Sequence, residues 1–292
     1  MTATQALVNA RYRLVPRGDG WLTTELMVCD RPKFNPHHYG LVGDAPHRRP
    51  APDVDDLTDD DRADYIERSK RRARKAVRDI MDCNDFEYFM TFTLDGGKID
   101  RTSYTEFVKA VTHYTKNRVQ RYGWSYLAVP EYHHDGEALH LHAVVRGDRY
   151  NLVDSGCVVN PKGGKPIKLS TALKYGYRRE DLKTVYNVTD WTLGFSTAIH
   201  TYGDRDALRR YVGKYITKSE DKIGGRWYFS GGNLARPLYV CCNIPFDDVE
   251  GDICFENDGG AFKIQYFDRK SDKTDFEKGE VNDSLALERN EE

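Results

Sequence analysis

Apolar residues recur at helical spacing in three segments, which predict helices at about residues 61–81, 102–120 and 204–219. The acidic residues Asp59 to Asp61 stand where they can cap the first helix, and Thr102 or Ser103 can cap the second. Gly123 follows the second segment and is the residue type that most easily ends a helix in the left-handed conformation.

Between these helices, β-branched and aromatic residues alternate with polar ones as in strands. The predicted strands cover about residues 86–94, 124–129, 138–145, 190–200, 226–230 and 236–241. The second and third strands are joined by the short segment PEYHHDGE, which predicts a hairpin. Because hairpins pair strands antiparallel, we expect an α+β fold with a central antiparallel sheet of about five strands and flanking helices packed on one face.

Composition divides the chain into three regions. Residues 1–60 are rich in Pro, Gly and His with little periodicity, which predicts an irregular N-terminal extension. Residues 61–245 hold the predicted helices and strands and form the expected domain, with the polar residues 147–187 as an insertion. Residues 246–292 are expected to form an acidic tail whose end is disordered.

The net charge of −2 conceals an uneven distribution. Residues 1–64 carry 8 basic and 11 acidic residues (net −3), residues 65–240 carry 30 and 20 (net +10), and residues 241–292 carry 6 and 15 (net −9). A basic centre suits a nucleic-acid partner. A solvated charged surface with acidic, solubilising ends explains the same distribution, so charge alone does not decide between them.

The six cysteines form no CxxC pair, and Cys241 and Cys242 are adjacent, which is a poor arrangement for a disulfide scaffold or a structural zinc site. We therefore expect reduced thiols and a cytoplasmic protein. The sequence has no apolar signal segment at its N-terminus, and no stretch approaches the roughly 20 apolar residues of a membrane span.

Two histidines stand two residues apart in the predicted strand ALHLHAVV. Alternation places His140 and His142 on one face of that strand, where both can bind one cation. Glu131, on the preceding strand of the hairpin, can add a carboxylate oxygen on the same face. This ligand set suits Mg²⁺ or Mn²⁺, although zinc also fits it. His133 and His134 are weaker alternatives as ligands, and a sheet surface that merely carries histidines is the structural alternative.

The segment RRYVGKYITKSE places two tyrosines and two lysines at helical i, i+4 spacing. Tyr211 and Tyr215 therefore share a helix face, and Lys214 and Lys218 form an adjacent stripe. A phenol is a weak nucleophile, and a nearby lysine or metal ion favours its reactive phenolate form. An amphipathic helix with tyrosine in the core and lysine in solvent explains the same spacing.

Polar and basic side chains elsewhere are candidates for DNA contacts. The predicted strand FMTFTLD places the hydroxyls of Thr91 and Thr93 on one face, where they can bind the DNA backbone or shape the site. The expected insertion contains Lys165, Arg178 and Arg179, which are typical of phosphate contacts.

Three segments in a fixed order, FMTFT, PEYHHDGEALHLH and YVGKYITK, resemble the motifs of the HUH endonucleases, named for a histidine, a hydrophobic residue and a second histidine. The similarity covers about residues 86–240 and is strongest to the two-tyrosine rolling-circle replication initiators of single-stranded DNA phages and related plasmids. It implies the HUH nuclease fold, with an RRM-like layout. His140 and His142 match the histidine pair, and Glu131 matches the third metal ligand.

The resemblance also implies a reaction. Tyr211 and Tyr215 match the two nucleophiles, which alternate in cutting and rejoining the strand and leave a 5′-phosphotyrosine link and a free 3′-OH. Lys214 and Lys218 both fit the lysine of the tyrosine motif, so that role stays open between them. The implied partners are single-stranded origin DNA, a host DNA polymerase and, because no Walker A motif is found, a host helicase, all in the bacterial cytoplasm.

Three other functions remain as alternatives to a replication initiator. An HUH relaxase or transposase would use the same chemistry on other DNA. A metal-dependent phosphodiesterase would use water in place of tyrosine. A non-catalytic single-stranded nucleic-acid-binding module would need no metal and would form no covalent adduct.

Overall fold

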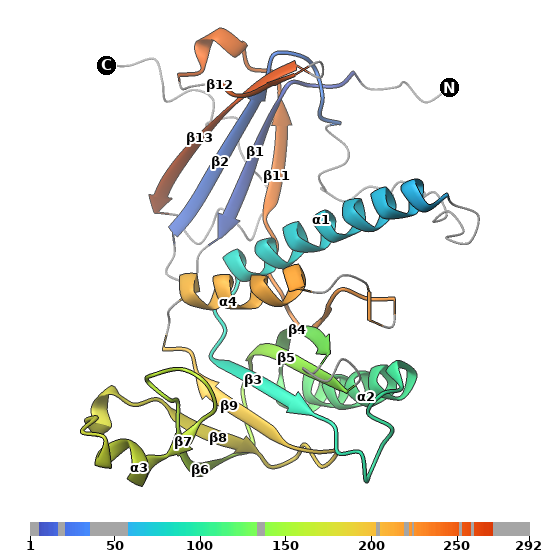
Figure 1. The fold of residues 1–292 in the computed structure, drawn as a ribbon. Coiled ribbons are helices and arrows are strands. Elements are labelled where there is room, and N and C mark those ends of the chain that lie inside the picture. Colours follow the sequence, from blue (N-terminus) through green and yellow to red (C-terminus); the bar gives the residue numbers. More distant parts are fainter. Residues whose placement is uncertain are drawn as a thin grey trace. The chain divides into compact units, whose positions relative to one another are not determined.

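The computed structural model describes residues 6–16, 21–35, 58–132, 138–202, 205–218, 222–223, 225–250, 253–257 and 260–270. They belong to two compact units, one formed by residues 1–53 with 235–292 and the other by residues 54–234. Each unit contains one sheet, and all strand pairs among the described residues are antiparallel (Figure 1). The expected α+β class is therefore confirmed.

The sheet of the 54–234 unit has eight strands in the order β10-β4-β5-β3-β9-β8-β6-β7. The strands are β3 (Tyr88–Thr93), β4 (Ser125–Tyr132), β5 (Leu139–Arg146), β6 (Leu152–Val158), β7 (Ile167–Lys168), β8 (Thr184–Val188), β9 (Ser196–His200) and β10 (Phe229–Gly231).

The expectation of about five strands was too low, because residues 147–187 are not a mere insertion. They contribute β6, β7 and β8 to the sheet, together with the short helix α3 (Leu169–Lys174) (Figure 1). A small separate core of Val158, Ala172 and Leu182 holds this part together. These apolar residues are scattered among polar ones in the sequence, so no clear periodicity marks them.

Three longer helices agree with their sequence signals. α1 covers Asp59–Cys83, and its N-cap is Thr58, whose hydroxyl accepts a hydrogen bond from the backbone N–H of Asp61. α2 covers Tyr104–Tyr122, with Ser103 as its N-cap and Gly123 in the left-handed conformation at its end (φ 63°), as predicted. α4 covers Arg205–Lys218.

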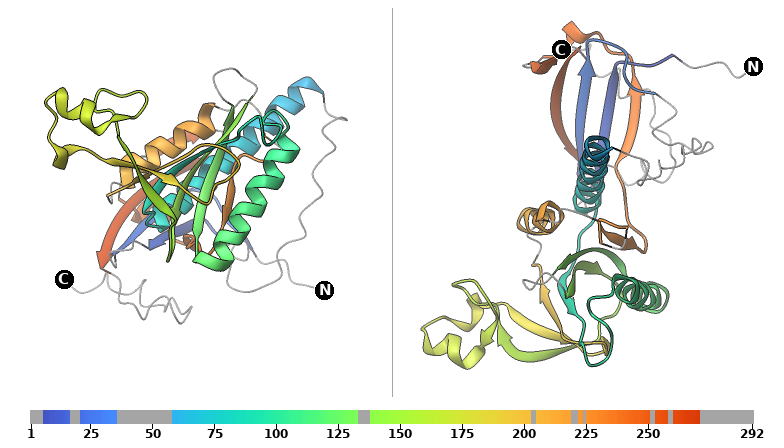
Figure 2. Two further views of the ribbon diagram at one scale, coloured as in Figure 1. Left: turned by 90° about the horizontal axis from the view of Figure 1, so that it is seen from below. Right: turned by 45° about the vertical axis from the view of Figure 1, so that its right-hand side comes forward.

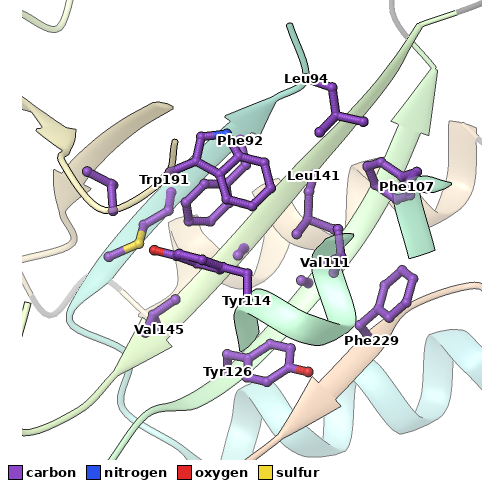
Figure 3. Close-up of a cluster of buried hydrophobic side chains, with 14 of the residues drawn as sticks. Phe92, Leu94, Phe107, Val111, Tyr114, Tyr126, Leu141, Val145, Trp191 and Phe229 are labelled. Atoms are coloured by element: carbon purple, nitrogen blue, oxygen red, sulfur yellow. The ribbon is translucent and has the colours of Figure 1, made fainter. Parts of the chain in front are cut away.

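Helices cover both faces of the eight-stranded sheet, where the sequence predicted them on one face (Figure 2). One face packs against α2 in a core that includes Phe92, Phe107 and Trp191 (Figure 3). The opposite face packs against α1 and α4, with Leu127 and Val144 of the sheet and Val212 of α4 all buried. The central strands are apolar on both faces, and each apolar face must be covered.

The second unit has a five-stranded sheet in the order β11-β1-β2-β13-β12. Its strands are β1 (Ala10–Pro16), β2 (Trp21–Cys29), β11 (Leu238–Cys242), β12 (Ile253–Asn257) and β13 (Gly260–Lys270).

These strands correct three expectations. The N-terminal residues 10–29 form strands rather than an irregular extension, and residues 253–270 of the expected tail form two further strands. β11, which was expected in the central domain, pairs with β1 instead. Charged residues on the outer faces of these strands dilute the apolar pattern, and each sheet neighbour of β1 except β2 lies over 200 residues away.

Candidate functional site

The registers of three neighbouring strands line up the polar residues of one sheet face. Glu131 of β4 is directly opposite His140 of β5, and on the other side of β5 His140 is opposite Thr93 of β3. Two residues along, His142 is opposite Thr91. Because cross-strand partners point to the same face, these five side chains lie together on the face that α1 and α4 partly cover.

The three expected metal ligands are close to one another. Nε2 of His142 lies 2.9 Å from Oε2 of Glu131, and both side chains are largely shielded from solvent. The rings of His140 and His142 are nearly parallel, with their centroids 6.4 Å apart. His133 and His134, the alternative ligands, lie outside the described residues.

The two threonines contact the histidines directly, a role that the sequence did not reveal. Oγ1 of Thr91 lies 3.2 Å from Nδ1 of His142, and Oγ1 of Thr93 lies 3.4 Å from Nδ1 of His140. A hydrogen bond at one ring nitrogen fixes the orientation of the imidazole and leaves its other nitrogen for a ligand. The equal two-residue spacing of both pairs was visible in the sequence, but the pairing of β3 with β5 was not.

The donor atoms fit a divalent cation in type. Two imidazoles and one carboxylate are a common ligand set for Mn²⁺ and related ions. Among the described residues, no three His, Cys, Asp or Glu side chains are already arranged as a complete metal cluster. Glu131 and His142 come closest to it, because their separation of 2.9 Å is near the roughly 3 Å between adjacent ligands of an octahedral ion with bonds of about 2.1 Å.

Helix α4 brings Tyr211 to this face of the sheet. Val212 is buried in the core beneath the helix, and Arg209 forms a 3.0 Å ion pair with Asp82 of α1, which holds the two helices together. The Tyr211 ring packs edge-on against Phe89 of β3, with centroids 4.9 Å apart, and remains 44% exposed. Phe89 in turn stacks on His142, with centroids 5.9 Å apart. A continuous row of rings therefore connects Tyr211 to the histidines.

The other candidates on α4 are only partly described. Lys214 lies in the helix with an exposed side chain, three residues after Tyr211. Tyr215 and Lys218 also belong to the helix, but their side chains lie outside the described part of the structure.

The basic candidates Lys165, Arg178 and Arg179 are not near the histidines. They lie beside β7 and α3, at the far edge of the sheet, five strand positions or about 24 Å from β5. Arg178 pairs with Asp181 at 2.9 Å, and Arg179 donates hydrogen bonds to the Leu182 carbonyl and to Thr184. The two arginines therefore also hold the local turn in place.

A basic face on α1 was not among the candidate sites drawn from the sequence, although the run RSKRRARKAVR signals it. Residues 68–78 contain seven basic residues and no acidic ones. The exposed ones at one face of the helix are Arg68, Arg71, Arg72, Lys75 and Arg78. The opposite face of the helix packs on the sheet that carries the histidines, so the positive charge belongs to the same unit as the site.

Residues 87–220 match the family model of replication-associated proteins of the ORF2 type. The match covers a little under half of the chain, begins one residue before β3 and ends two residues after α4. It thus includes all the candidate site residues and supports a replication initiator family. No curated protein and no solved structure matches the chain. None of the helices within the described residues has the length and apolar character needed to cross a membrane.

Proposed function

We propose that this chain is a rolling-circle replication initiator that nicks single-stranded origin DNA through a tyrosine nucleophile. The similarity of residues 87–220 to replication-associated proteins supports the role in replication. The ring contacts from Tyr211 through Phe89 to His142 support the chemistry, because they bring a partly exposed phenol to the face that holds two imidazoles and a carboxylate.

The residues that would hold a divalent cation are His140, His142 and Glu131. Bound there, Mg²⁺ or Mn²⁺ would act as a Lewis acid toward a phosphate oxygen. Thr91 and Thr93 keep the two imidazoles in the orientation in which Nε2 faces the ligand. Packing of α1 and α4 over the neighbouring apolar residues limits the water around these side chains.

The Tyr211 oxygen attacks the scissile phosphorus, and the bond from phosphorus to the 3′-oxygen breaks. The phenol loses its proton, and the departing 3′-oxygen gains one, so the products are a 5′-phosphotyrosine link and a free 3′-OH. Lys214 lies one helical turn from Tyr211, where its charge offsets the negative charge that builds on the phosphate. The phosphodiester energy is kept in the covalent link, which allows later rejoining.

Tyr215 is placed one helical turn from Tyr211 in the same helix. In this proposal it attacks the junction that is regenerated after one round of synthesis, and Lys218 serves it as Lys214 serves Tyr211. Transesterification then releases the displaced strand as a circle. A host polymerase extends the 3′-OH, and a host helicase separates the strands.

A denaturing gel tests this function. The full chain is incubated with labelled single-stranded DNA from the origin region of its own replicon, with Mn²⁺ or with EDTA. We expect a protease-sensitive covalent adduct that requires the metal, persists in Tyr211→Phe or Tyr215→Phe alone, and is lost in the double variant. Cleavage without an adduct in the double variant would show hydrolysis by water, and DNA binding without cleavage of the origin strand would show a binding module.

A further inference from the structure

The most exposed large apolar side chain of the described residues lies at the edge of the candidate site. Phe195, immediately before β9, is 79% exposed. The sequence predicted residues 190–200 as one strand, yet only Ser196–His200 form β9, and the preceding residues form a turn. A phenyl ring held in water is unfavourable unless something covers it during function.

The backbone around Phe195 is held in place by contacts with β3 and with the turn. Its carbonyl accepts a 2.9 Å hydrogen bond from the N–H of Thr93. The Thr93 carbonyl accepts a 3.1 Å hydrogen bond from the Trp191 indole, and Trp191 is itself buried. The Cβ of any larger residue at Gly194 would lie 2.0 Å from that carbonyl, so only glycine lets the turn pass this close. The exposed ring is therefore presented by a fixed backbone.

The position of Phe195 extends the row of site residues by one strand. The β3–β9 register continues to place Phe195 opposite Thr93, which is opposite His140. Alternation from Thr197, the partner of Thr91, puts the Phe195 side chain on the same face as the histidines. Two strand spacings, about 10 Å, separate its backbone from that of His140.

We propose that Phe195 stacks on a base of the bound single strand, next to the phosphate that is cut. This inference rests on the proposed function, because it takes the histidine face as the place where the strand is cut. An exposed ring with no charge offers nothing to phosphates but matches the flat face of a base. The fixed turn then sets the distance between that base and the histidine face, so the ring positions the scissile phosphate along the strand.

Binding of two strands that differ only in their bases tests this inference. The probes are a labelled mixed-sequence single strand of roughly 16 nucleotides and a strand of the same length with abasic sugars throughout. Stacking predicts that Phe195→Ala weakens binding of the base-bearing strand roughly 5- to 150-fold. Binding of the abasic strand stays unchanged, because its phosphates are the same. Phe195→Tyr keeps the ring and retains the affinity of the unchanged chain.

The control is Tyr104→Ala, which removes another exposed ring, 56% exposed, from α2 on the opposite sheet face. Equal weakening of both strands by Phe195→Ala, or no weakening of either, would overturn the proposal. So would loss of self-association on a sizing column without a change in DNA affinity. Because the ring is exposed, the thermal midpoint of Phe195→Ala should match that of the unchanged chain.

Single abasic substitutions along the origin strand locate the stacked base. The effect of Phe195→Ala on affinity should disappear when the base next to the nick is missing, and a position far from the nick would contradict the placement. The covalent adduct is measured separately with the same proteins. If the unchanged chain forms no adduct, the proposed function fails, whereas an adduct without base-dependent sensitivity at Phe195 overturns only the stacking.

Discussion

Oε2 of Glu131 lies 2.9 Å from Nε2 of His142, although the two residues belong to different strands. A direct carboxylate–imidazole contact of this kind is where a divalent cation would be shared by both groups. We predict that Glu131→Gln lowers the affinity of the full chain for Mn²⁺ more than about 10-fold, measured by calorimetric titration. Glu180→Gln, which neutralises an exposed carboxylate at the far edge of the sheet, should leave it unchanged. Equal Mn²⁺ affinity in the Glu131 variant and the unchanged chain would place the metal elsewhere.

The hydroxyl of Thr91 is expected to matter through His142 rather than through DNA. Thr91→Val keeps the shape of the side chain and removes its 3.2 Å contact with Nδ1. We expect Mn²⁺ affinity and the rate of adduct formation to fall about 10- to 100-fold. DNA affinity measured in EDTA should not change.

Two further variants make this test specific. Thr91→Ser keeps the hydroxyl and should restore Mn²⁺ binding. Thr197→Val makes the same change at the residue opposite Thr91 on β9 and serves as the matched control. A loss of DNA affinity in EDTA with Thr91→Val would instead indicate a direct contact with the strand.

The basic face of α1 is expected to contribute to DNA affinity through phosphate contacts. Neutralising Arg71 and Arg78 together by substitution with Gln should weaken binding of a single strand and reduce the slope of log affinity against log salt by about 0.7 per lost contact. Titrations at several salt concentrations measure that slope. The control is neutralisation of Lys109 and Lys116, two exposed lysines of α2 on the other side of the sheet. The same decrease in slope with the control pair would indicate a general effect of charge.

Alkaline pH should destabilise the fold through buried tyrosines. Burial raises the pKa of Tyr114 well above its usual range, and the neighbouring Asp190 carboxylate, 2.9 Å from the phenol oxygen, raises it further. A raised pKa favours the neutral phenol in the folded chain. The stabilisation is therefore complete below about pH 10, the unfolded value, and is lost as pH rises above it.

Tyr114→Phe separates this effect from general alkaline unfolding. At neutral pH it should lower the free energy of unfolding by about 1–3 kcal/mol, because the hydrogen bond to Asp190 is lost. Between pH 10 and higher values its thermal midpoint should fall less steeply than that of the unchanged chain. Parallel curves for the two proteins would rule out Tyr114 as the titrating group.

Local signals in the sequence predicted the local structure well. The cap at Ser103 and the terminating Gly123 depend on residues within one helix, so they could be recognised without the fold. The alternation of His140 and His142 and the pairing with Glu131 depend on one hairpin, and the structure brings these three together on one face. Whether they bind metal, and whether Tyr211 and Tyr215 are nucleophiles, stay predictions.

Contacts between distant segments were not predictable. Thr91 meets His142 across 51 residues, and β1 pairs with β11 from the opposite end of the chain. Sequence periodicity gives the face of a strand but not its neighbour, so the threonines were assigned to DNA and the N-terminal strands were missed. The exposure of Phe195 likewise depends on a turn that only Gly194 permits.

The measurement that tests the central claim most directly is the identification of the residue joined to DNA. The full chain is reacted with its origin strand in Mn²⁺, digested with nuclease and trypsin, and analysed by mass spectrometry. The proposed function predicts a nucleotide phosphate on the oxygen of Tyr211 or Tyr215 in the peptides of α4. A nucleotide on a residue outside α4, or a cleaved strand with no nucleotide-linked peptide, would contradict it.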